Sequence, residues 1–344
     1  MQVQAVLLVL FLVGSGYASP ASYEEHFAVQ LLNAAAAAYP DDKLVAETCL
    51  SKAFGNETGY QVLTAATATC GKKSGDICKA YIARSDVDKI FIIGIRGTEG
   101  IPQLWHETES GLGNGMYPVN VTSNTAVRVV DYFYTASGYV FNTLRIQPNL
   151  IGYGDYDVYV TGHSLGGALA TLVAKRIVFS ELRTQDKVKL VTFGEPRVGN
   201  LAFATEIRST LDYMFRVVHG DDPIPHLPPC GDFASDLFDK NCKNEGWHQH
   251  AQEIWYWPQK KKMQLGTWKS CDPNNGEDPH CSDGESWGKR VMRDFFEGQG
   301  KVMHLNYFNH FISDYGKRGC VDGAATAAIS FVLFAFMGVL AMVF

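Results

Sequence analysis

Apolar residues along the chain fall into two kinds of stretch. Some are short, continuous runs, which are typical of strands covered on both faces. They lie at residues 89–95, 158–161, 188–193, 214–219 and 253–257. Others have apolar residues at helical spacing, and they lie at residues 24–38, 127–146, 167–179 and 202–211. Strands that alternate with helices predict an α/β protein with a largely parallel sheet and helices on both faces.

The N-terminal residues have the pattern of a secretory signal peptide. Residues 5–13 are apolar, and Gly16-Tyr17-Ala18 supplies small residues at the −3 and −1 positions of a cleavage point, so residues 1–18 are the predicted signal. No Lys or Arg precedes the apolar core, and a buried first helix is the alternative. The sequons at Asn56 and Asn120 are predicted glycosylation sites, since the lumenal side allows their use.

The C-terminal residues 323–344 form an apolar tail. Residues 324–344 carry no charged side chain and are long enough to span a bilayer. The tail is either a GPI-attachment signal, with candidate attachment positions near residues 322–324, or a retained transmembrane helix. Either alternative predicts a protein anchored to a membrane outside the cell.

Composition limits the remaining possibilities. The 344 residues could form one large core or two modest domains, and no repeat or linker interrupts residues 20–318, so we expect one domain over residues 19–322. The net charge is −6 and no basic stripe is present, which argues against a nucleic-acid partner. The short run Lys260–Lys262 is simplest as a solvated loop.

Eight cysteines behind a signal peptide predict disulfides formed in an oxidising compartment. Proximity favours the pairs Cys70–Cys78, Cys230–Cys242 and Cys271–Cys281, which leaves Cys49 and Cys320 to join the two ends of the domain. No C-x-x-C pair exists, so a zinc site is the weaker alternative.

The motif Gly162-His163-Ser164-Leu165-Gly166 lies between a predicted strand and a predicted helix. This context favours a nucleophile elbow, in which side chains at positions 162 and 166 would collide and must be absent. Such a turn exposes the hydroxyl of Ser164 at the carboxyl edge of a sheet. The sequence therefore predicts Ser164 as a nucleophile.

A serine nucleophile needs a histidine base and a carboxylate that orients the histidine. Asp221 and Asp222 follow the strand at 214–219, and prolines after Asp222 would stiffen its loop, although both acids could be simple turn residues. Several histidines downstream of Ser164 are candidate bases: His226, His248, His250, His280, His304 and His310. His248 and His250 could also bind a metal, but no clear third ligand accompanies them.

Ester or amide chemistry at Ser164 also requires hydrogen-bond donors for a negatively charged oxygen. The backbone N–H of Leu165 directly follows the nucleophile. Thr98 follows the strand at 89–95 and could supply both its N–H and its hydroxyl, unless it lies in an ordinary turn beside an ion-paired Arg96. We expect Thr98 and Leu165 to form the oxyanion hole.

Five motifs in order resemble the class 3, fungal-type triacylglycerol lipases, and they cover residues 25–320. The motifs are Ile95-Arg96-Gly97-Thr98, Gly162-His163-Ser164-Leu165-Gly166-Gly167-Ala168, Thr192-Phe193-Gly194-Glu195-Pro196-Arg197-Val198-Gly199-Asn200, Asp222-Pro223-Ile224-Pro225-His226-Leu227-Pro228-Pro229 and His304-Leu305-Asn306-Tyr307-Phe308. The resemblance implies an α/β-hydrolase fold with Ser164 as nucleophile, Asp222 as acid and His304 as base. It also supports Thr98 and Leu165 as the oxyanion hole, and the pairings Cys49–Cys320 and Cys271–Cys281.

The resemblance places a lid at about residues 99–115. Ile101, Leu104 and Trp105 lie there at roughly helical spacing, as in a hinged amphipathic segment that opens on lipid. A fixed loop that packs Trp105 into the core is the alternative. The pair Cys230–Cys242, the Trp-rich stretch 247–257 and the apolar tail depart from the fungal pattern, so the substrate preference can differ.

Together these features predict a secreted-pathway hydrolase of lipid esters that works through an acyl-enzyme. We expect no metal or organic cofactor, and the expected partners are a lipid or ester substrate at an interface and the membrane that holds the tail. Phospholipase A1 or a non-lipid carboxylesterase is the main alternative. A catalytically inactive binding protein would have lost a triad residue, whereas every candidate is present.

Overall fold

A computed structural model of the chain describes residues 21–70, 77–98, 116–118, 126–228, 246–257, 262–284 and 299–322. Several predicted features lie outside these residues. They are the signal peptide at 1–18, the lid at 99–115 with Ile101, Leu104 and Trp105, Asn120, the Cys230–Cys242 pair and the tail at 323–344.

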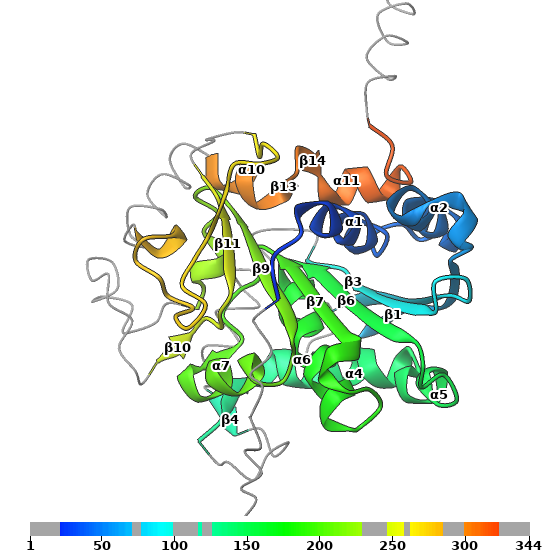
Figure 1. Ribbon diagram of the computed structural model, residues 1–344, viewed down its shortest axis with the longest axis horizontal. Helices are drawn as coiled ribbons and strands as arrows, with labels where there is room; N and C mark the ends of the chain where they lie inside the picture. Colours follow the sequence, from blue (N-terminus) through cyan, green and yellow to red (C-terminus); the bar gives the residue numbers. More distant parts are fainter. Residues whose placement is uncertain are drawn as a thin grey trace, which may run out of the picture.

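The fold is organised around one eight-stranded sheet, in the order β1-β2-β3-β6-β7-β9-β11-β12. The neighbours from β3 to β11 pair in parallel, while β1, β2 and β12 add antiparallel strands at the two edges (Figure 1). The strands of this sheet are β1 (Gln61–Thr69), β2 (Ile77–Ser85), β3 (Ile90–Ile95), β6 (Asp157–His163), β7 (Val188–Phe193), β9 (Tyr213–His219), β11 (Glu253–Tyr256) and β12 (Trp268–Ser270).

Two smaller sheets complete the strands. One has the order β10-β8-β5-β4 and the other joins β13 to β14. Their bounds are β4 (Met116–Pro118), β5 (Arg128–Val130), β8 (Gly199–Asn200), β10 (Trp247–His248), β13 (Asn306–Tyr307) and β14 (His310–Phe311).

Helices cover both faces of the large sheet, so the structure confirms an α/β-hydrolase arrangement. Figure 1 shows α1, α2 and α11 on one face and α4, α6 and α7 on the other, and a separate apolar core fills the space on each side. The helices are α1 (Glu25–Ala36), α2 (Lys43–Phe54), α4 (Asp131–Thr143), α5 (Ile146–Leu150), α6 (Leu165–Phe179), α7 (Leu201–Arg208), α10 (Gln299–Leu305) and α11 (Ile312–Lys317), with short 3-10 helices η1 (Asn56–Thr58), η2 (Gln185–Lys187), η3 (Ile224–His226) and η4 (Ser282–Gly284).

The parallel strands form where the sequence has continuous apolar runs. Strand β7 coincides with the predicted strand at 188–193, and almost all of its residues are buried because helices cover both faces. Helix α6 is buried along nearly its whole length, since it packs between the sheet and α4. Predicted and observed ends of the other core elements coincide or differ by at most three residues.

The single helix predicted over residues 127–146 is wrong at both ends. Residues 128–130 form β5, which pairs with β4 and β8, and α5 begins separately at Ile146. The β-branched residues Val127, Val129 and Val130 are buried at this end, and such side chains fit a pleated strand better than a helix.

Three of the predicted disulfides are present in the described part of the chain. Cys49–Cys320 joins α2 to the residues after α11, Cys70–Cys78 links the paired strands β1 and β2, and Cys271–Cys281 closes the loop after β12. Asn56 is exposed at the start of η1. None of the helices among the described residues is both long and apolar enough to cross a bilayer.

Candidate active site

The turn at Ser164 has the geometry of a nucleophile elbow. Ser164 lies between β6 and α6 with φ 58° and ψ −131°, and its N–H donates to the carbonyl oxygen of Phe193 over 2.9 Å. A Cβ atom at Gly162 would lie 2.2 Å from the carbonyl oxygen of Gly166, and one at Gly166 would lie 2.1 Å from that of Ile95. Only glycine fits at both positions, as the sequence predicted.

The structure brings Ser164, His304 and Asp222 together from three separate parts of the chain. His304 Nε2 lies 2.9 Å from Ser164 Oγ, and His304 Nδ1 lies 3.0 Å and 2.9 Å from the two carboxylate oxygens of Asp222. All three side chains are almost completely buried. This is the connectivity of a serine, a base and an orienting acid, and of the candidate histidines His304 is the one that meets Ser164.

The carboxylate of Asp222 accepts further hydrogen bonds. The hydroxyl of Tyr307 donates to Oδ2 over 2.6 Å, and the N–H of Ile224 donates to Oδ1 over 2.9 Å. Burial alone would raise the pKa of Asp222, but the charge and hydrogen bond of His304, with these other donors, hold that pKa below its ordinary value. Asp222 is therefore ionised at neutral pH and can stabilise a positive charge on His304.

A second histidine, His163, supports the backbone of His304. His163 Nε2 lies 2.7 Å from the carbonyl oxygen of His304, and the hydroxyl of Tyr39 lies 2.9 Å from His163 Nδ1. A carbonyl can only accept, so Nε2 carries the proton and Nδ1 accepts from Tyr39. Burial, and then the nearby His304, lower the pKa of His163 to about 3, so its imidazole stays neutral.

The segment after β3 passes directly beside Ser164. A Cβ atom at Gly97 would lie 3.0 Å from Ser164 Cβ and 2.6 Å from the carbonyl oxygen of His163. Thr98 is the next residue, and Leu165 is the first residue of α6, where helical N–H groups lack a partner within the helix. Both predicted oxyanion donors thus belong to segments that adjoin Ser164.

Arg197 holds the loop that carries Asp222. The backbone N–H of Arg197 donates to the carbonyl oxygen of Leu227 over 2.7 Å, and the guanidinium of Arg197 donates to the carbonyl oxygens of His226 and Pro228. The same guanidinium makes a buried, two-point ion pair with Glu277, at 2.7 Å and 2.6 Å. Burial alone would raise the pKa of Glu277, but the charge and hydrogen bonds of Arg197, with the nearby His248 and the N–H of Gln249, together lower that pKa.

The other candidate histidines lie elsewhere. Each contacts a carboxylate or is partly buried away from Ser164: His226 beside Asp283, His250 beside Glu195, His280 beside Asp278, His310 beside Asp322, and His248 in β10. Among the described residues, the group with metal-ligand spacing is Glu253, Cys271 and Cys281. Its two sulfur atoms form a disulfide, so it does not fit a metal ion.

Sequence reasoning missed three residues that shape the site. Gly194 has φ +59°, and a Cβ there would lie 2.7 Å from Asp222 Oδ2 and 3.0 Å from His304 Nδ1. Tyr307 and His163 contact the acid and the backbone of the base, respectively. All three lie inside the motifs quoted above, but the spacing of those motifs does not reveal which way a side chain points.

Comparisons with known proteins agree with this geometry. Residues 92–232 match the family Lipase (class 3). The chain is 35% identical over 319 residues to Lipase ZK262.3 of Caenorhabditis elegans, covering 87% of this chain and 83% of that protein. It is also 49% identical over 71 residues, 20% of each chain, to Secreted mono- and diacylglycerol lipase 1 of Fusarium solani.

A solved lipase from Rhizopus microsporus var. chinensis has the same fold. Its TM-score is 0.61 at 24% identity, over 86% of this chain and 88% of that one. The fold and the kinship define a carboxylic ester hydrolase of the α/β-hydrolase class. Within that class, the chain belongs to the class 3 lipase family.

Proposed function

We propose that this protein hydrolyses lipid esters through an acyl-enzyme, with Ser164, His304 and Asp222 as its catalytic triad. The observation that carries the proposal is the pair of contacts made by His304, to Ser164 Oγ at 2.9 Å and to Asp222 Oδ2 at 2.9 Å. A base hydrogen-bonded to both a nucleophile and an ionised acid is the arrangement that activates a serine hydroxyl.

The reaction has two halves. Ser164 Oγ attacks the ester carbonyl carbon while His304 Nε2 takes the hydroxyl proton, and His304 then gives this proton to the departing alcohol. Water, deprotonated by His304, next attacks the acyl-enzyme, which releases the fatty acid and restores Ser164. Asp222 stays ionised and stabilises the imidazolium in both halves.

The N–H and hydroxyl of Thr98 and the N–H of Leu165 are the proposed donors to the tetrahedral oxyanion. The support is their location beside Ser164, on the segment after β3 and at the start of α6. The test is Thr98→Ala against Thr98→Ser. If the hydroxyl assists, the alanine variant loses kcat while the serine variant keeps most of it.

Acylglycerols are the proposed substrate class, because the relatives are named lipases and one is a mono- and diacylglycerol lipase. Phospholipids and short-chain esters remain the competing substrates. A substrate panel of tri-, di- and monoacylglycerol, phosphatidylcholine and a soluble short-chain ester, measured on the purified protein, ranks them by kcat/KM. A preference for phosphatidylcholine would contradict the acylglycerol proposal.

We also propose that residues 19–322 form a lipase domain of the secretory pathway, tethered to a membrane by residues 323–344. The apolar N-terminal residues, the disulfides and a secreted relative support the secretory route. Treatment of expressing cells with phosphatidylinositol-specific phospholipase C should release the protein if the tail is a GPI signal. Retention after that treatment, with loss of retention on deleting residues 323–344, would indicate a transmembrane helix instead.

The nucleophile is tested with a fluorophosphonate probe. We expect the wild-type protein to be labelled and Ser164→Ala to be neither labelled nor active. Ser180→Ala, which changes a serine after α6, is the matched control and should behave as the wild type. Labelling that persists in Ser164→Ala would refute the assignment.

A further inference from the structure

A pair of stacked tryptophans stands at the carboxyl end of β11. The rings of Trp255 and Trp257 lie 4.9 Å apart with an angle of 24° between their planes. Trp257 is 42% exposed, although burial of an indole is strongly favourable. Two stacked indoles, one of them 42% exposed, are an unusual use of apolar surface and indicate a binding role.

The pair is fixed to the loop that leads to Asp222. Trp255 Nε1 donates to the carbonyl oxygen of Gly220 over 2.8 Å, and Gly220 lies two residues before Asp222. The next residue, Asp221, donates its N–H to the sulfur of Met303, the neighbour of His304. Because β11 pairs in parallel with β9, the indole pair at its carboxyl end lies at the same edge of the sheet as the loop of Asp222, where an ester substrate has to arrive.

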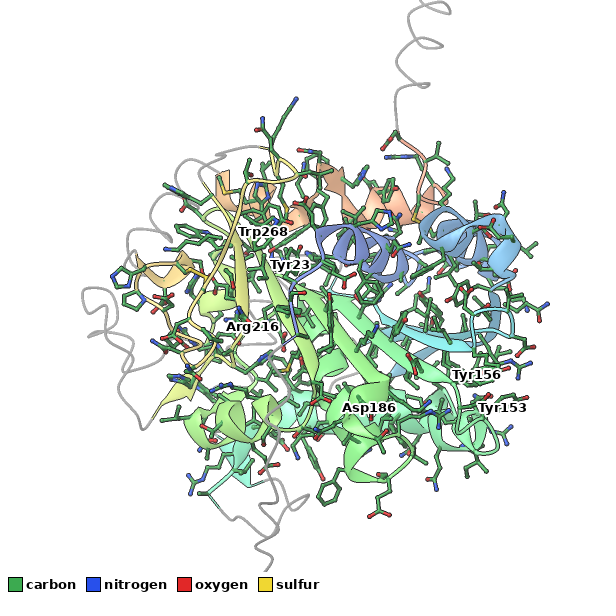
Figure 2. All side chains as sticks on the ribbon, viewed as in Figure 1. Tyr23, Tyr153, Tyr156, Asp186, Arg216 and Trp268 are labelled. Atoms are coloured by element: carbon green, nitrogen blue, oxygen red, sulfur yellow. A yellow bond between two sulfur atoms is a disulfide. The ribbon has the colours of Figure 1, made fainter. Side chains whose placement is uncertain are left out.

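The same hairpin carries more apolar and positive surface. Leu265 in the connecting loop is exposed, and Lys269 on β12 lies opposite Trp255. Trp268 lies opposite Tyr256, so it belongs to the other face of the sheet, where its ring centroid is 5.0 Å from that of Tyr23. Figure 2 shows the side chains of Trp268 and Tyr23 near each other. Lys262 and Lys269 are exposed on the same hairpin, in a chain with a net charge of −6. Indoles beside lysines match the chemistry of an anionic lipid interface, where indoles sit among the headgroups and lysines meet the negative surface.

We propose that Trp255, Trp257, Lys262 and Lys269 form a lipid-contact surface, in which Trp257 inserts among the headgroups of an anionic lipid surface and holds the active-site edge against it. The proposal rests on the proposed function, because the triad then meets ester substrate at that interface. Trp255 acts as the rigid base on which Trp257 stands, and Lys262 and Lys269 add attraction to negative headgroups.

The first test uses the full chain with Ser164→Ala, so that lipid is bound but not consumed. Vesicles contain equal parts of phosphatidylcholine and phosphatidylserine with brominated acyl chains, which quench tryptophans that enter the bilayer surface. We expect strong quenching in the parent, at least half of it lost in Trp257→Ala, and no loss in Phe179→Ala. Phe179 is an exposed aromatic residue at the far end of α6 and is the matched control.

The second test concerns charge and catalysis in the otherwise wild-type chain. Lys262→Glu should weaken binding to these vesicles by about tenfold or more and leave binding to pure phosphatidylcholine nearly unchanged. Trp257→Ala should reduce hydrolysis of lipid in such vesicles by about tenfold while turnover of a soluble short-chain ester stays the same.

Three results would overturn the lipid-contact surface. The first is unchanged quenching in Trp257→Ala, and the second is an equal loss of soluble and vesicular turnover in that variant. The third is a change from dimer to monomer in sedimentation when Trp257 is replaced by alanine, which would make this surface a contact between two copies. These results differ from a failure of the proposed function, in which Ser164→Ala would keep its hydrolytic activity while Trp257 is still quenched by lipid.

Discussion

The nucleophile elbow (residues 162–166) and the acid–base arm (residues 220–228 and 299–308) meet within 3 Å but are built by different means. The elbow is the more local of the two: a Cβ at Gly162 would lie 2.2 Å from the carbonyl oxygen of Gly166, four residues later, and Gly166 in turn packs against Ile95 of β3. The arm depends on contacts between distant residues, since Asp222 and His304 are 82 residues apart and Arg197 and Glu277 are 80 apart. A local turn resists most distant changes, whereas the arm can lose its position through a change far from Ser164.

The largest expected effect is a loss of catalysis with the fold left intact. Asp222→Asn should lower kcat by about 10⁴-fold, because the amide no longer orients His304 or stabilises its positive charge. The fold should survive, since asparagine has nearly the same shape, and near-UV circular dichroism checks this. Activity within tenfold of the wild type would show that Asp222 is not the acid that orients His304.

A break in the elbow should act on stability as well as activity. Gly162→Ala should lower the free energy of unfolding by more than about 4 kcal/mol, because its Cβ would collide with the backbone of Gly166. Urea denaturation measures this. Gly154→Ala is the control, since no heavy atom lies within 4 Å of its Cβ position, and it should change stability by less than about 1 kcal/mol.

A substitution far from Ser164 should disturb the acid–base arm, in contrast to the elbow. Glu277→Gln removes the buried two-point ion pair of Arg197 and leaves Asp283, 3.6 Å from the guanidinium, as the carboxylate beside it. This should cost about 3 kcal/mol of unfolding free energy. Because Arg197 holds the loop of Asp222, kcat should fall as well. The matched control is Asp155→Asn, which removes an exposed ion pair with Lys89 and should leave both quantities nearly unchanged. Equal effects of the two variants would show that the Arg197–Glu277 ion pair contributes no more to stability and kcat than an exposed ion pair does.

His163, which belongs to the elbow and contacts the backbone of His304 in the arm, predicts a pH dependence. The folded protein holds the pKa of His163 at about 3, below its unfolded value of about 6.5, so the unfolded chain binds a proton first as the pH falls. Stability should therefore decrease on acidification, by about 2 kcal/mol from His163 alone between pH 6.5 and 5. His163→Gln should flatten that decrease in urea titrations at the two pH values. An unaltered slope would mean that another group causes it.

The smallest expected effect concerns Tyr307. Tyr307→Phe removes a 2.6 Å hydrogen bond to Asp222 but keeps the ring, so kcat should fall by about tenfold. Tyr315→Phe, on α11, serves as the control and should not change kcat. A loss as large as that of Asp222→Asn would mean that Tyr307 sets the whole geometry of the acid.

The sequence predicts the parallel core well because that part of the fold follows from burial. A strand such as β7 must be apolar throughout when helices cover both faces, so its ends are visible in the sequence. The β1–β2 hairpin was not predicted. Strand β1 has mostly Ala and Thr, and only alternate residues are partly or fully buried, so it lacks an apolar run.

The same limit applies to the site. Ser164, Asp222 and His304 occur in recognisable motifs, and their order along the chain is informative. Glu277 lies in a turn-rich segment with no motif, and its pairing with Arg197 follows only from the folded arrangement. Side-chain orientation, which gives Tyr307 and His163 their roles, is a property of packing and not of spacing.

The Cys49–Cys320 disulfide has a consequence for the order of synthesis. Cys49 is the first cysteine of the chain to be made and Cys320 is the last, 271 residues later. Cys70 meets its partner after only eight further residues, whereas Cys49 has to remain a thiol, or exchange out of a wrong bond, until nearly the whole domain has been translated. A free thiol at Cys49 is thus a chemical mark of an unfinished chain, and its disappearance reports that both ends have come together.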